Sequence, residues 1–179
     1  MSNKLKIFLV ILTSITVATG IYSNRLNKKS EIVTSISAPT IESIKKTEIT
    51  TLIFFPDFKV GKLSSQDIIL SSNLINKEDI LKDIISQLIL KLEEKQILKK
   101  ESLKYEVYLK NRTIYLDLDS KVLASAKNPQ EELLLIYSFV NSLLTPGGAD
   151  TVVLLINGAP TDKVNFININ KSYKLNSNI

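Results

Sequence analysis

The chain contains no histidine and no cysteine among its 179 residues. This absence excludes Ser-His-Asp and Cys-His nucleophile systems, zinc sites, thiol redox chemistry and structural disulfides. It also excludes the lipid-accepting cysteine of a bacterial lipoprotein. We therefore predict no catalytic residue, no cofactor-binding residue, no metal ligand and no cofactor, and we expect a protein that is not an enzyme.

The chain also lacks a basic groove interleaved with aromatic residues. Its net charge of +5 is spread along the sequence, with small clusters at Lys45-Lys46 and Lys99-Lys100. Such lysines are typical of solvated faces, so we expect no nucleic-acid partner. An apolar fraction of 44% and a charged fraction of 23% indicate a folded globular domain, and the length allows one core.

The N-terminus has the pattern of an export signal. Two lysines precede residues 7–22, a run without any charge. We interpret residues 1–22 as a signal anchor, short for a spanning helix unless tilted. A cleaved signal peptide is the alternative, because the spacing of Ala18 and Gly20 suits a signal peptidase.

Residues 23–46 are rich in Ser, Thr, Asn and charge and contain Pro39, which is typical of a flexible linker. We therefore expect a domain on the extracytoplasmic side, tethered to the membrane through the N-terminal helix. It would be secreted if the signal were cleaved.

The folded part begins with a predicted hairpin and a predicted helix. Residues 48–55 are rich in β-branched and aromatic side chains and end at Pro56-Asp57, and a second run covers 63–70 after the Gly61-Lys62 turn. Asn76, with Asp79 three residues later, caps a helix that is predicted to reach about Lys95. Its apolar residues recur at helical spacing: Ile80, Leu81, Ile84, Ile85, Leu88, Ile89 and Leu92.

A second hairpin follows from strand alternation. With Asn111-Arg112 as a two-residue turn, Leu109 faces Ile114. One face is then apolar, with Val107, Leu109, Ile114, Leu116 and Leu118. The other face carries Tyr108, Lys110, Tyr115, Asp117 and Asp119.

Two features of that second face are candidates for function. The carboxylates of Asp117 and Asp119, two residues apart, have a spacing that can serve acid-base work or a hard cation. We interpret them as solvated strand carboxylates, because further oxygen ligands and a nearby glycine are missing. Tyr108 and Tyr115 lie side by side across the hairpin and can form a sugar-stacking platform, although such pairs commonly just stabilise sheets.

The C-terminal half is predicted to hold a helix and an interior strand. Asn128-Pro129 with Glu131 forms a capped helix start, a broad apolar face follows, and residues 145–148 end the helix. Residues 151–156 form a continuous apolar run, which predicts a strand inside the sheet. Residues 164–169 alternate and are a further strand candidate, and residues 171–179 form a tail that looks frayed.

Together these elements predict an α+β fold. It is a two-layer sandwich with two helices packed on one face of a small mixed sheet, in the order β-β-α-β-β-α-β, preceded by the N-terminal apolar helix. The folded domain is predicted to span residues 47–170.

The ordered set of these segments resembles the GerMN domain of bacterial sporulation and germination proteins. The resemblance covers roughly residues 48–166 and rests most on 114–119, 131–145 and 152–158. It implies a compact α+β domain similar to the ring-building modules of secretion and sporulation machines, which are exported, membrane-tethered and non-enzymatic. The chain departs from the pattern in having one copy of the domain, no lipoprotein cysteine, and residues 91–95 where a Gly-Pro often follows the first helix.

Two functions follow as hypotheses. The first is an interaction domain of the cell envelope that assembles with itself or with other envelope proteins, through an uncovered sheet face or helix surface. The second is a module that binds cell-wall glycan or peptide, assists a wall hydrolase and uses Tyr108 and Tyr115.

Overall fold

The computed structural model describes residues 49–70 and 76–179. All of them belong to one compact unit, Lys46–Ile179. The predicted anchor at 1–22 and the predicted linker at 23–46 lie outside the described residues. Within the described ranges, no helix is both long enough and apolar enough to cross a membrane.

The elements follow the predicted order, with a short helix and a short strand added. In chain order they are β1 (Ile49–Asp57), β2 (Lys62–Leu70), α2 (Lys77–Glu94), β3 (Tyr105–Lys110), β4 (Thr113–Leu118), α3 (Ser120–Ala124), α4 (Pro129–Leu144), β5 (Thr151–Ile156) and β6 (Ser172–Tyr173). The predicted caps are present, since the side chains of Asn76 and Asn128 accept hydrogen bonds from the amides of Asp79 and Glu131.

The first hairpin pairs β1 and β2 in antiparallel register. Its turn is built on Asp57, whose side chain accepts from the amides of Lys59 and Val60. Gly61 then adopts φ +72°, a conformation that glycine reaches without strain. Pro56 and Asp57 belong to β1, so the strand runs two residues beyond the predicted stop.

The second hairpin has the predicted register, with Leu109 opposite Ile114. Both turn residues, Asn111 and Arg112, have positive φ, as a two-residue type I′ turn requires. From β4 the chain crosses through α3 and α4 and returns as β5, which lies parallel to β4. Parallel neighbours need such a crossover because a tight turn can only reverse the chain.

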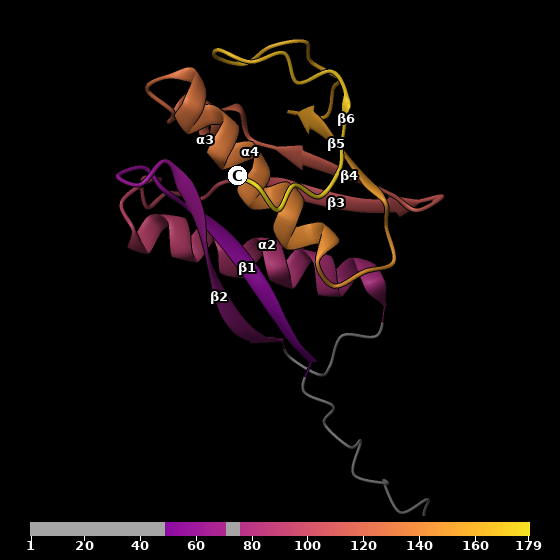
Figure 1. The fold of residues 1–179 in the computed structure, drawn as a ribbon. Coiled ribbons are helices and arrows are strands. Elements are labelled where there is room, and N and C mark those ends of the chain that lie inside the picture. The colour runs from indigo at the N-terminus through magenta and orange to yellow at the C-terminus, as the bar shows by residue number, and fades with distance from the viewer. Residues whose placement is uncertain (1–48, 71–75) are drawn as a thin grey trace, which may run out of the picture. The chain divides into compact units, whose positions relative to one another are not determined.

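The prediction of a single sheet is wrong. The strands form a two-stranded sheet, β1-β2, and a four-stranded sheet, β3-β4-β5-β6. Figure 1 shows α2 and α4 between the β1-β2 hairpin and the larger sheet, so the domain has three layers. The contacts agree, because β1 packs on both helices while α2 packs on β3 and α4 on β5.

The burial of α4 explains the third layer. From Leu134 to Leu144 every residue of this helix is buried except Tyr137, which is half-buried. A helix that is apolar around most of its circumference needs cover on more than one side. The sheet covers one side and the hairpin covers another, where Ser142 accepts a hydrogen bond from the backbone amide of Phe54 in β1.

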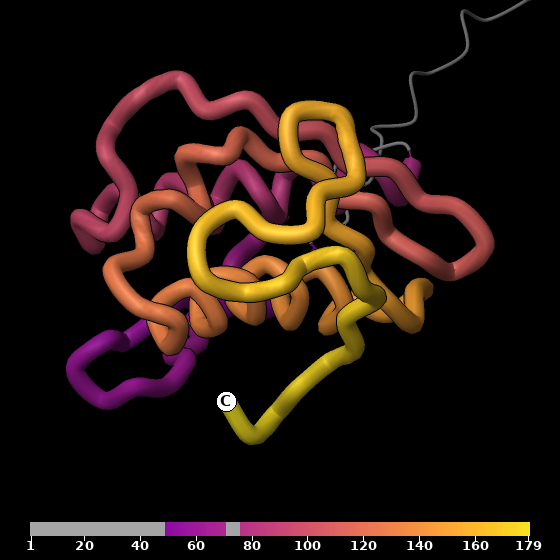
Figure 2. The backbone as a smooth tube through the Cα atoms, turned by 90° about the horizontal axis from the view of Figure 1, so that it is seen from above, coloured from indigo at the N-terminus to yellow at the C-terminus, as the bar shows by residue number. Residues whose placement is uncertain are grey.

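The C-terminal segment also differs from prediction. Residues 164–169 form no strand, and the only ladder contact there is a bridge between Lys163 and Asn168. The expected frayed tail instead supplies β6, which pairs with β5, and the Tyr173 side chain is 2% exposed. Figure 2 shows this segment from above, running beside α4.

Candidate functional site

The outer face of the four-stranded sheet is the candidate site. Alternation along β3, β4 and β5 sends one set of side chains toward the helices. All of them are buried except the half-buried Tyr105 and Leu109: Tyr105, Val107, Leu109, Ile114, Leu116, Leu118, Val152, Leu154 and Ile156. The alternate residues point to the other face, and each of them is half-exposed or exposed. We name this second set the outer sheet face.

The register of the three long strands arranges the outer sheet face in rows. Residues that pair across β3, β4 and β5 lie side by side. The rows are Lys110-Thr113-Thr151, then Tyr108-Tyr115-Val153, then Glu106-Asp117-Leu155.

The central row is apolar and aromatic. Tyr108 is 49% exposed and pairs directly with Tyr115, as the sequence predicted, and Val153 continues the row on β5. Tyrosine combines a large apolar ring with a polar hydroxyl and is enriched where proteins bind partners. The central row therefore has the chemistry of a contact surface.

One side of the central row is basic. Lys110 is exposed and forms no ion pair within the described residues. At the adjacent turn, the Arg112 guanidinium makes two hydrogen bonds, of 2.8 and 2.6 Å, to the carboxylate of Asp150. These bonds hold the pKa of Asp150 below its usual value. The Arg112–Asp150 pair holds the turn in place. The ammonium of Lys110 is therefore the basic group on this side that is available to a partner.

The other side of the central row is acidic. Glu106 forms a 3.0 Å ion pair with Lys82 of α2, and this hydrogen bond raises the pKa of Lys82. The carboxylate of Asp117 accepts from the backbone amide of Gly158 at 2.9 Å. Both carboxylates keep part of their surface exposed.

The prediction that Asp117 and Asp119 share one strand face is wrong. β4 ends at Leu118, and Asp119 is the N-cap of α3, where its side chain accepts from the amide of Lys121. The two carboxylates therefore hold two different backbone segments. Across the described part of the chain, no group of three or more acidic residues is placed to bind a metal ion.

A depression of 590 Å³ lies at the acidic end of the outer sheet face. Glu106 and Asp117 contribute to it from the strands, Lys104 precedes β3, and Asn157 and Gly158 follow β5. It is open and mixed in polarity, so it extends the contact surface rather than enclosing a reaction.

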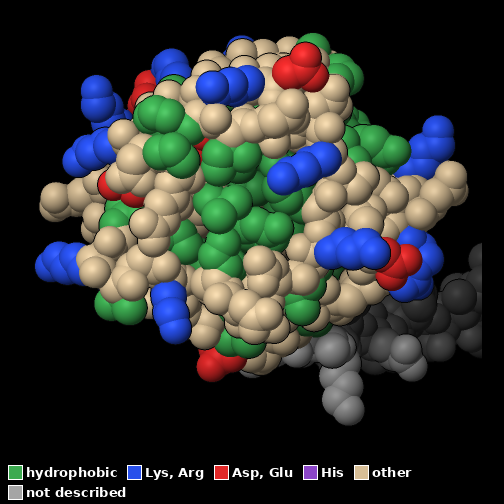
Figure 3. Space-filling model, turned by 45° about the horizontal axis from the view of Figure 1, so that its top comes forward, with side chains coloured by type: hydrophobic (Ala, Val, Ile, Leu, Met, Phe, Trp, Pro, Cys, Tyr) green, Lys and Arg blue, Asp and Glu red, His purple; other side chains and the backbone are tan. Residues whose placement is uncertain are grey.

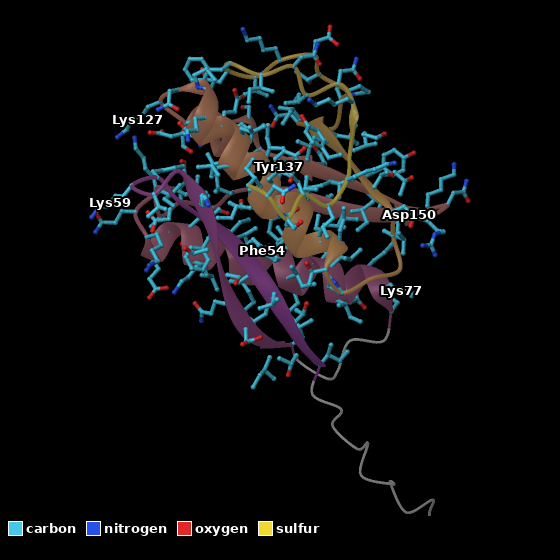
Figure 4. The ribbon with its side chains drawn as sticks, in the orientation of Figure 1. Phe54, Lys59, Lys77, Lys127, Tyr137 and Asp150 are labelled. Atoms are coloured by element: carbon cyan, nitrogen blue, oxygen red, sulfur yellow. The ribbon has the colours of Figure 1, made fainter. Side chains whose placement is uncertain are left out.

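A second apolar area lies on another face of the molecule. Figure 3 shows apolar side chains gathered in a hollow framed by lysines. Phe54 of β1 and Tyr137 of α4, both labelled in Figure 4, are half-buried aromatic residues. The ring of Tyr137 packs edge-to-face against that of Tyr173, with the ring centroids 5.8 Å apart.

The sequence identified the tyrosine pair but missed Val153 and Leu155. Their segment is a continuous apolar run, from which we expected a strand inside the sheet, and β5 does lie between β4 and β6. The parallel position of β5 beside β4 brings both residues onto the outer sheet face. The signal was the β-helix-β order, because a helical crossover is the connection that parallel neighbouring strands need.

The chain was compared with family models, curated protein sequences and solved structures. A family model described as "Germane: Sporulation and spore germination" matches residues 53–162, from β1 to the loop after β5. No curated protein sequence matches the chain. Among solved structures, the chain is similar to the 2.5 Å crystal structure of a "Putative Lipoprotein from Clostridium perfringens". The TM-score is 0.46 and the identity 18%, over 71% of this chain and 87% of that chain.

Proposed function

The chain belongs to the Germane family of sporulation and spore germination proteins, and we propose that it is a non-enzymatic interaction domain that assembles in the bacterial cell envelope through its outer sheet face. The membership confirms the resemblance to the GerMN domain. The observation that carries the proposal is the apolar row of Tyr108, Tyr115 and Val153 between a basic and an acidic row.

This arrangement of charges suits contact between two copies of the chain. A two-fold axis along the central row places the basic row of one copy on the acidic row of the other. Lys110 of one copy then meets Glu106 of the second copy, twice in each dimer, and joins the Glu106–Lys82 ion pair of that copy. Such self-complementarity is the requirement for a closed two-fold interface, and complementary charges fix its register.

The place of action in this proposal is the outer side of the membrane. It rests on the uncharged run at 7–22 behind two lysines, which has the pattern of an export anchor. The polar linker at 23–46 lets the domain reach partners a short distance from the bilayer. Other envelope proteins of complementary charge are the second class of partner for the same face.

A charge-swap experiment tests the proposal. The variants are Lys110→Glu, Glu106→Lys and the double variant, measured by sedimentation of the full chain in lipid nanodiscs or detergent. Each single change places like charges opposite each other and should weaken self-association by roughly tenfold. The double variant restores opposite charges and should recover most of the association. Equal association for all three variants would count against this face.

Cell-wall glycan binding is the second candidate, because the exposed Tyr108 ring offers a stacking surface. A pull-down of the full chain on purified wall material, with Tyr108→Ala and Tyr115→Ala, separates the two functions. Glycan stacking requires both rings, so both changes should abolish retention, while Lys110→Glu should leave it intact. Retention unaffected by either tyrosine change would remove this candidate.

A further inference from the structure

A small apolar cavity lies away from the outer sheet face, on the helix side of the sheet. Its volume is 240 Å³, and it sits between the start of α2, the β3-β4 hairpin and the loop that follows α4. The apolar lining comes from these three segments and from the start of β1: Ile49, Ile80, Leu81, Leu109, Ile114, Pro146 and Ala149. Concave sites with a largely apolar lining and a few polar groups are typical of small-ligand binding.

One cation stands at this cavity. Lys77, the first residue of α2, contributes to the lining and is exposed. A Cβ atom added at Gly148 would lie 3.4 Å from the Lys77 ammonium, so the ammonium lies over the loop. Figure 4 shows Lys77 at the end of α2. In the described ranges the Lys77 ammonium makes no hydrogen bond and no ion pair.

Two acidic groups near this end of the molecule have other partners. The carboxylate of Glu78 accepts a hydrogen bond from the Leu109 amide, and the carboxylate of Asp150 is held by Arg112. Within the described residues, no carboxylate forms an ion pair with the Lys77 ammonium. A ligand that supplies one would form a charge-assisted hydrogen bond, which is about twice as strong as a neutral one.

The loop beside the cavity is open because it is made of glycine. Gly147 and Gly148 have φ of +81° and +92°, and a Cβ at Gly147 would meet nothing within 4 Å. Their backbone lines the cavity without side chains. A ligand can therefore approach the apolar lining and Lys77 together.

We propose that this cavity binds an apolar carboxylate, with the apolar group among the aliphatic side chains and the carboxylate on Lys77. The volume lies below the range of about 300–1,000 Å³ that is usual for drug-sized ligands. It suits a group the size of one leucine or phenylalanine side chain. The same chemistry can be presented by the C-terminal residue of a polypeptide or by a free acid.

The five glycines of the chain make this testable by NMR. We would label the full chain with ¹⁵N-glycine in lipid nanodiscs and titrate it with a soluble peptide ending in leucine, with the same peptide amidated, and with N-acetyl-leucine. The signals of Gly147 and Gly148 should move on binding, while those of Gly61 and Gly158, which lie outside the cavity, should not. The acid should bind roughly tenfold more tightly than the amide.

Two variants complete the test. Lys77→Gln removes the charge at an exposed site and should erase the preference for acid over amide, whereas the control Lys174→Gln should retain it. Stronger binding of the peptide than of N-acetyl-leucine identifies a polypeptide terminus as the source, and equal binding identifies free acids. Equal affinity of acid and amide for the unaltered chain, or shifts spread over all glycines, would overturn the proposal.

Discussion

Asn141 and Asn176 exchange two hydrogen bonds. The side-chain amide of Asn141 donates to the backbone carbonyl of Asn176 at 2.8 Å, and the backbone amide of Asn176 donates to the Asn141 side-chain oxygen at 3.0 Å. Asn141 is 2% exposed and lies near the end of α4. One side chain thus replaces a strand partner for the last residues of the chain and docks them on the helix.

Asn141→Ala should release this docking. Both backbone groups of Asn176 lose their partner, and we expect a loss of about 1–3 kcal/mol in the free energy of unfolding. Urea unfolding measures the loss, and hydrogen exchange should show faster exchange of the Asn176 amide. The control is Asn178→Ala, at an exposed position two residues further on. If both variants lost the same stability, the docking role of Asn141 would be refuted.

Tyr173→Phe should leave stability at pH 7 unchanged or raise it by about 1 kcal/mol. The Tyr173 hydroxyl is buried and has no hydrogen-bond partner among the described residues, so its removal relieves a desolvation cost. The ring keeps its edge contact with Tyr137. Urea unfolding at pH 7 measures the difference, and a loss of more than 1 kcal/mol would show that the hydroxyl has a stabilising partner.

The same residue predicts a pH dependence at the alkaline end. Burial, followed by the nearby Tyr137 and Glu132, raises the pKa of Tyr173 to about 12. In the unfolded chain a tyrosine titrates near pH 10. Between these values the unfolded state releases a proton that the folded state retains, so stability is lost as the pH rises from about 10 to 12. Tyr173→Phe should reduce the loss over this interval, and an unchanged loss would contradict the assignment.

Gly61→Ala should destabilise the domain by about 1–2 kcal/mol because an L residue at positive φ is strained. A Cβ at this position would also lie 2.7 Å from the Gln130 side-chain nitrogen. That group is the end of a flexible side chain and can move. We therefore expect Gly61→Ala to lower the free energy of unfolding by the same amount in the Gln130→Ala background as in the unaltered chain. If Gly61→Ala cost no stability in the Gln130→Ala background, the steric contact with Gln130 would be the cause of the destabilisation.

The sequence predicted those parts of the fold whose patterns are local. The register of the β3-β4 hairpin follows from alternation through the Asn111-Arg112 turn. The caps at Asn76 and Asn128 follow from side-chain chemistry within four residues. Such features depend on neighbours in the chain, so a single sequence is enough to find them.

The parts that could not be predicted depend on contacts distant in the chain. The β1-β2 hairpin joins no larger sheet because it covers α4, and the Phe54–Ser142 hydrogen bond joins residues 88 positions apart. Glu132 resembles a surface residue of a first helical turn. It is 0% exposed because its carboxylate accepts from the amides of Phe166 and Ile167. No local sequence pattern predicts either the position of the hairpin or the burial of Glu132.

The most direct measurement of the proposed assembly uses the absence of cysteine from the chain. A cysteine introduced at one position is then the only thiol of the chain. Oxidative crosslinking in intact sporulating cells identifies the molecule that lies next to that position. We compare Tyr108→Cys on the outer sheet face with Gln66→Cys on β2 and Phe54→Cys on β1. We expect a crosslinked dimer, or an adduct with another envelope protein, from position 108 alone. Crosslinking from position 54 with none from 108, or from no position, would contradict it.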